Sequence, residues 1–120
     1  MKKFVIALCF IFLIATVIVL RPVPIVHEAD AVTERGVVTA VYDGGGSDIV
    51  FKLKNNERTF YINRGLQAGI ELNELRESLI GNEITLKYPK YWTPLDWENK
   101  IKHLSKVEFE NIIVFNEFKE

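Results

Sequence analysis

Residues 49–62 have the sequence IVFKLKNNERTFYI, which predicts two β-strands joined by a tight turn. Apolar side chains occupy every second position on both sides of the turn: Ile49, Phe51, Leu53, Phe60 and Ile62. This two-residue period is typical of strands that bury one face and expose the other. The asparagines at 55–56 tolerate the left-handed backbone that turns require. The stretch therefore predicts a hairpin whose outer face carries Lys52 and Lys54.

The neighbouring segments extend the pattern in both directions. Residues 36–42 are rich in β-branched side chains and predict a strand, which a glycine-rich loop at 43–48 separates from the hairpin. Residues 71–80 change to a helical period, with three leucines on one face. Further strands are predicted at 84–88, 107–109 and 112–115.

The order of three strands, a short helix, a strand and a terminal hairpin resembles the oligonucleotide/oligosaccharide-binding (OB) fold. That fold is a five-stranded Greek-key barrel, and the resemblance implies a helix between its third and fourth strands. The resemblance covers residues 34–117 and implies a mainly β domain, an OB-like barrel of five to six strands with one short helix. The same pattern allows an open α+β sheet covered by one helix.

A shorter resemblance is carried by the run Phe60-Tyr61-Ile62-Asn63-Arg64-Gly65-Leu66. This run is similar to one found in small, uncharacterised, membrane-anchored bacterial proteins. The resemblance implies display at a membrane and brings no activity with it.

The N-terminus predicts a transmembrane helix. Lys2 and Lys3 precede an unbroken run of 17 residues, 4–20, in which Thr16 is the only polar side chain. Such a helix is about 25 Å long, at the short end for a bilayer core of about 30 Å. Prolines at 22 and 24 then end the helix. We expect residues 1–21 to be an uncleaved signal anchor.

A cleaved signal peptide is the alternative. Its cleavage site would be Ala29-Asp30-Ala31, about ten residues beyond the apolar run and far for cleavage. The two lysines before the run favour a cytoplasmic N-terminus, so the expected location is a single-pass membrane protein with its domain outside the cytoplasm. With cleavage the domain would be secreted or periplasmic. Residues 22–33 are expected to be a tether, and residues 34–120 the domain.

Length and charge exclude several classes of function. The chain has 120 residues, which leaves room for one small domain. It carries 15 basic and 16 acidic side chains, and the part beyond residue 30 is slightly acidic. Because nucleic-acid binding depends on positive charge, no nucleic-acid partner is expected.

The residues that usually carry catalysis do not form a recognisable pattern. The single cysteine, Cys9, lies in the apolar run, and His27 and His103 have no serine at a recognisable spacing. The sequence therefore predicts a protein that is not an enzyme, with no cofactor and no metal site.

Two groups of side chains are candidates for ligand binding. Tyr91, Trp92 and Trp97 lie close together in a loop stiffened by prolines, and exposed aromatic side chains often anchor partners. The outer face of the predicted hairpin offers the second group: Lys52, Lys54, Tyr61 and Asn63. The alternatives are that the rings fold back and fill the end of the barrel, and that the hairpin face is only solvated.

These observations favour a membrane-anchored, extracytoplasmic binding or assembly module with a protein or carbohydrate partner, held in the membrane by residues 4–20. One alternative is a cleaved, secreted or periplasmic barrel that binds carbohydrate or peptide. Another is an accessory subunit of a membrane complex that acts through its anchor helix.

Overall fold

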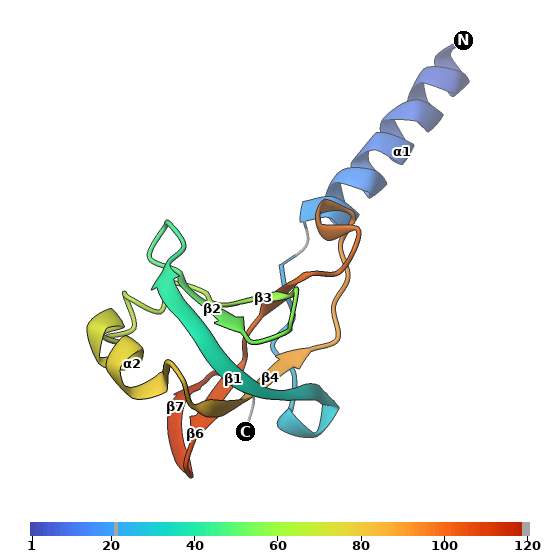
Figure 1. The fold of residues 1–120 in the computed structure, drawn as a ribbon. Coiled ribbons are helices and arrows are strands. Elements are labelled where there is room, and N and C mark those ends of the chain that lie inside the picture. The colour runs from blue at the N-terminus through green and yellow to red at the C-terminus, as the bar shows by residue number, and fades with distance from the viewer. Residues whose placement is uncertain (21, 119–120) are drawn as a thin grey trace.

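The computed structural model describes residues 1–20 and 22–118. Its first element, α1 (Lys2–Leu20), projects away from the rest of the chain and buries none of its side chains (Figure 1). The helix is long and apolar enough to cross a membrane, and an N-terminal signal sequence shares these properties. The predicted apolar helix is thus confirmed.

The remainder of the described chain is mainly β, as predicted. Seven strands form one sheet in the order β5-β3-β2-β1-β4-β6-β7. Their bounds are β1 (Ala31–Asp43), β2 (Ile49–Leu53), β3 (Thr59–Ile62), β4 (Glu83–Pro89), β5 (Ile101–His103), β6 (Lys106–Phe109) and β7 (Ile112–Asn116). One short helix, α2 (Leu72–Leu79), and two 3-10 turns, η1 (Glu28–Asp30) and η2 (Pro94–Asp96), complete the described elements.

The long strand β1 lies at the centre of the sheet and pairs with two strands, β4 and β2. Its first half pairs with β4, from Ala31 opposite Pro89 to Val37 opposite Glu83. Its second half pairs with β2, and the register shifts after Val38. The strand begins at Ala31, five residues before the predicted start, because pairing with β4 supplies backbone hydrogen bonds to a stretch that its polar side chains do not mark as a strand.

The predicted alternation in β2 fails at Val50, which is buried. The glycine-rich loop covers this residue: a Cβ atom on Gly44 would collide with the Val50 side chain, so only glycine permits the close approach. The basic outer face of β2 therefore begins at Lys52, which is half-buried.

The core lies between the sheet and α2. Leu75 and Leu79 of α2 are buried with side chains from β1, β2, β3, β4 and β6. The guanidinium Nε of Arg76 donates to the carbonyl of Val41 at 2.7 Å, which attaches the helix to β1. The helix predicted over residues 71–80 is confirmed, one residue shorter at each end.

A two-residue crossing joins β5 to β6. The Leu104 amide donates to the carbonyl of Tyr61 in β3, and the next amide, of Ser105, donates to the carbonyl of Lys87 in β4, both at 2.8 Å. Leu104 and Ser105 are fully buried. Consecutive residues thus connect two strands that are not neighbours in the sheet order. The sequence did not predict β5, because three residues are too few to reveal a period.

The segment before β1 is attached to the sheet by ion pairs. Glu28, in η1, contacts Lys87 of β4 at 2.6 Å and Lys106 of β6 at 2.8 Å. These hydrogen-bonded ammonium groups lower the pKa of the Glu28 carboxyl from 4.5 to about 2. Residue 28 lies in the range that the sequence assigns to the tether, so at least this part of the range contacts the domain.

The crossing predicts opposite effects for two substitutions of Ser105. Its hydroxyl is buried and has no hydrogen-bond partner among the described residues, so Ser105→Ala removes an unsatisfied group and should leave stability unchanged or raise it by up to about 1 kcal/mol. Ser105→Pro removes the amide that bonds to Lys87 and should cost about 3 kcal/mol. Thermal unfolding of the full chain in detergent, followed by circular dichroism, measures both. A proline variant as stable as the alanine variant would contradict the role of this amide.

The Glu28 ion pairs predict a specific dependence of stability on pH. Because folding lowers the pKa of this carboxyl, its contribution is complete above about pH 5, falls as the pH decreases toward 2 and is absent below that. Glu28→Gln should therefore lower Tm at pH 7, and its Tm should converge with that of the wild type at pH 2. Glu77→Gln, at an exposed position on α2, is the matched control and should follow the wild-type curve. A Glu28→Gln deficit that persists at pH 2 would contradict the prediction.

Candidate functional site

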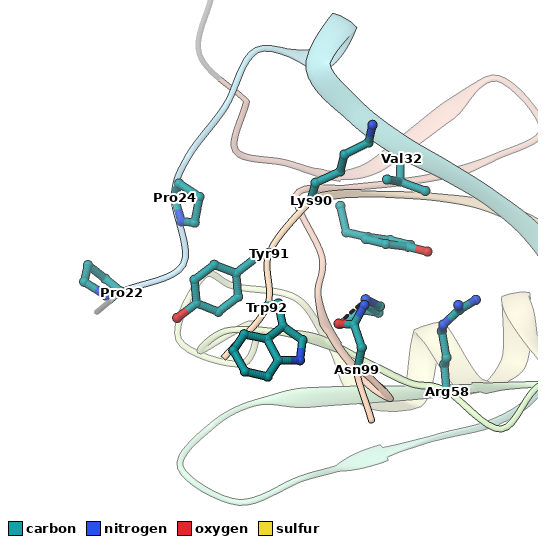
Figure 2. Close-up of a pocket in the computed structure, with 10 residues that line it drawn as sticks. Pro22, Pro24, Val32, Arg58, Lys90, Tyr91, Trp92 and Asn99 are labelled. Carbon is teal, nitrogen blue, oxygen red and sulfur yellow. Dashed lines mark hydrogen bonds between the residues drawn. The ribbon is translucent and has the colours of Figure 1, made fainter. Parts of the chain in front are cut away.

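A cleft with a volume of about 740 Å³ lies where the chain enters the β domain. Its walls come from the segment after α1, from the loop after β4 and from the residue before β3 (Figure 2). The lining residues are Pro22, Pro24, Val32, Arg58, Tyr88, Lys90, Tyr91, Trp92, Asn99 and Lys102.

The cleft is cationic, although the chain as a whole is slightly acidic. Arg58, Lys90 and Lys102 line it, and none of its lining residues is acidic. The Lys102 ammonium lies 5.3 Å from the centre of the Tyr88 ring and donates to Asn99 Oδ1 at 2.6 Å. Burial, and then the charge of Arg58, lowers the pKa of Lys102. An anion entering the cleft would favour the charged form of this lysine.

The Glu34 carboxylate forms hydrogen bonds to two residues that line the cleft, Tyr88 and Arg58. Glu34 of β1 accepts hydrogen bonds from the Tyr88 hydroxyl at 2.9 Å, from Arg58 Nη1 at 3.2 Å and from the Asn56 amide at 2.9 Å. Burial and the bond to Glu34 raise the pKa of Tyr88 to about 12, so Tyr88 stays a neutral donor. This network fixes side chains from three separate segments before any ligand arrives.

The loop between β4 and β5 has a defined conformation. Both carboxylate oxygens of Asp96 accept backbone amides, from Lys100 at 3.0 Å and Ile101 at 2.8 Å. The Trp92 indole nitrogen donates to the Trp97 carbonyl at 3.1 Å, and the two rings meet edge to face at 5.1 Å. Both tryptophans remain exposed. The alternative that the rings fold back and fill the end of the barrel is therefore wrong for Trp92 and Trp97, which pack on each other outside the core.

A smaller pocket of about 190 Å³ lies beside the cleft and shares Tyr91 and Lys102 with it. It contains Tyr61 and His103, whose rings meet edge to face at 5.3 Å. His103 Nε2 lies 2.6 Å from Glu117 Oε1. Burial is the main cause that raises the pKa of Tyr61, followed by the charge of Asp48. Thr93 also lines this pocket, where its hydroxyl oxygen accepts the Leu95 amide and so caps η2.

The structure divides the residues that the sequence singled out. Tyr91 and Trp92 line the cleft, Tyr61 lies in the smaller pocket, and Trp97 packs on Trp92. Trp97 lies outside both cavities, and so do the other three candidates: Lys52, Lys54 and Asn63.

Lys52 forms hydrogen bonds to the turn that precedes β3. Its ammonium donates to the carbonyls of Glu57 and Arg58 and to the Thr59 hydroxyl, at 3.0 to 3.4 Å. It thus closes the turn between β2 and β3. Lys54 and Asn63 are exposed at the ends of these strands.

Sequence reasoning missed eight of the ten lining residues, of which five are polar or aromatic: Arg58, Tyr88, Lys90, Asn99 and Lys102. They come from different segments and have no common spacing. Only Lys90 and Asn99 had a usable signal, because both lie in the same loop as the aromatic residues.

Within residues 1–20 and 22–118, no three histidine, cysteine, aspartate or glutamate side chains gather to hold a metal ion. The arrangement is suited to binding, because aromatic rings, three cations and the Asn99 side chain line one solvent-open cleft. Comparison with protein-family models, with curated proteins and with solved structures gave no match.

Proposed function

We propose that this chain is a single-pass membrane protein that displays a non-enzymatic binding module outside the cytoplasm, and that the cleft is its ligand site. The cleft carries the proposal, because three cations and three aromatic rings from separate segments line one open cavity. Fixed walls reduce the ordering cost of binding, which favours recognition by a preformed site.

Retention of α1 is supported by the contacts that follow it. Cleavage after Ala31 would remove Glu28, and with it the ion pairs to Lys87 and Lys106. It would also cut at Ala31, which pairs with Pro89 at the start of β1. These contacts favour an uncleaved anchor over a secreted domain.

The pairing pattern supports an OB-like barrel within the mainly β domain. β1 pairs with both β2 and β4, β3 runs parallel to β5, and α2 lies between β3 and β4 in the chain. If β5 and β6 are one strand bent at Leu104 and Ser105, that strand contacts both β3 and β4. OB barrels bind ligands beside the loop that follows the fourth strand, and here that loop forms a wall of the cleft.

The ligand that fits this chemistry is an anionic carbohydrate chain. Arg58 and Lys90 offer positive charge at the rim, while Tyr91 and Trp92 offer flat apolar faces for sugar rings. Asn99 supplies a polar group at the same wall. A neutral sugar would leave the cations unused, and an acidic peptide would leave the aromatic faces without a matching ring.

The anchor is tested by the mass of the protein recovered from membranes. We expect the full chain, with residues 1–31 present. The control is a variant that carries a strong cleavage site directly after residue 21, which shows that cleaved product would be detected. A wild-type N-terminus at Val32 would contradict retention of the anchor.

The ligand is tested by titration of the full chain in detergent micelles, with tryptophan fluorescence as the readout. Polygalacturonate should bind, and dextran, which is neutral, should not. Lys90→Gln should weaken binding about threefold to tenfold, because one charge contact is worth about 1 kcal/mol. Lys54→Gln, at an exposed lysine outside both cavities, is the matched control and should bind like the wild type.

Two results would overturn the proposed ligand. The first is an equal loss of affinity for the Lys90 and Lys54 variants, which would indicate charge attraction without a site. The second is tighter binding of polyglutamate than of polygalacturonate, which would assign the cleft to acidic peptides.

A further inference from the structure

Exposed apolar side chains gather in the loop between β4 and β5 and at Ile101, the first residue of β5. Trp97 is 73% exposed, Leu95 72%, Ile101 54% and Trp92 40%. Soluble surfaces rarely leave so much apolar area together, and such patches mark contact with a partner or a membrane. Trp92 also lines the cleft, so the cluster adjoins the cleft.

The register of the sheet places this loop beside the end of α1. Pro89, the last residue of β4, pairs with Ala31 at the start of β1, so the loop leaves the sheet where the N-terminal segment enters it. Val23 lines the smaller pocket together with Leu95. Figure 1 shows the loop at the base of the helix.

The distance from the helix end matches the thickness of a membrane interface. α1 ends at Leu20, and Val23 follows three residues later, a span of at most about 10 Å. The polar layer on each side of the hydrocarbon core is roughly 5 to 8 Å thick. With α1 across the bilayer, Leu95 beside Val23 therefore lies at the level of this layer.

The composition of the loop suits the membrane interface. Tryptophan prefers the membrane interface, where its ring meets acyl chains and its N–H finds an acceptor. The hydrogen bonds of Asp96 and the contact between Trp92 and Trp97 hold the loop in shape, so insertion orders little additional chain. Lys90, the first residue of this loop, is exposed and can face anionic lipid headgroups.

We propose that this loop inserts Trp97 and Leu95 into the interface of the same bilayer that α1 spans. The inference rests on the proposed function, in which α1 is retained as an anchor. The domain is then held at two points, the helix and the loop, and the cleft opens next to the lipid headgroups in a fixed orientation.

A second exposed apolar pair provides an internal comparison. Ile112 and Ile113 lie on the hairpin of β6 and β7 and are exposed to a similar extent. Figure 1 shows this hairpin at the opposite end of the domain from α1. If apolar exposure alone decided membrane contact, this hairpin would insert as readily as the loop.

Tryptophan fluorescence tests the proposal directly, because both tryptophans of the chain lie in this loop. The full chain, with α1 verified by mass, is reconstituted into phosphatidylcholine vesicles that contain phosphatidylglycerol. Lipids brominated near the headgroup end of the acyl chains should reduce the fluorescence about twofold or more, as expected for a ring 5 to 10 Å inside the boundary. Unchanged fluorescence with α1 present would overturn the proposal.

The matched control places a single tryptophan on the hairpin of β6 and β7 instead of the loop. The variant Trp92→Phe/Trp97→Phe/Ile112→Trp has one tryptophan at a comparably exposed apolar position, and its fold is checked by circular dichroism. We expect no quenching from this site. Equal quenching at both positions would overturn specific docking by the loop. Because α1 is intact in every sample, this result is independent of whether cells cleave the anchor and of whether the cleft binds polygalacturonate.

Discussion

The crossing at Leu104 and Ser105 is the constraint on which the rest of the domain depends. Two successive buried amides bond to β3 and then to β4, so the chain must pass between these strands at this point. This fixes β5 along β3 and leaves the preceding loop to connect the end of β4 with the start of β5. Since β4 ends opposite the start of β1, that loop can only lie where the N-terminal segment joins the sheet.

The cleft is a consequence of this geometry. The loop contributes Lys90 and Trp92, the turn before β3 contributes Arg58, and the N-terminal segment closes the remaining side. Glu34 accepts hydrogen bonds from both Arg58 and Tyr88. These bonds hold the two side chains in place on the wall of the cleft. A chain with slightly more acid than base thereby presents a cationic cavity, because net charge says nothing about where the charges gather.

Much of the fold could be predicted from the sequence, and the site could be predicted only in part. The alternation around residues 49–62 marks a hairpin, since a half-buried strand needs a two-residue period. The early start of β1 and the existence of β5 could not be found in this way, because both depend on backbone pairing with distant strands. The aromatic loop was recognised from Tyr91, Trp92 and Trp97, whereas Lys52 was assigned to the site and proves to close its own turn.

The sequence by itself determined the apolar helix, the mainly β class and the position of the short helix, because each follows from the local period of apolar side chains. Only the tertiary structure decided which cations share a cleft, which aromatic rings stay exposed and which end of the domain lies beside α1. Those properties depend on the register between β1 and β4 and on the crossing at Leu104 and Ser105. Both are contacts between residues far apart in the chain, and no local pattern encodes them.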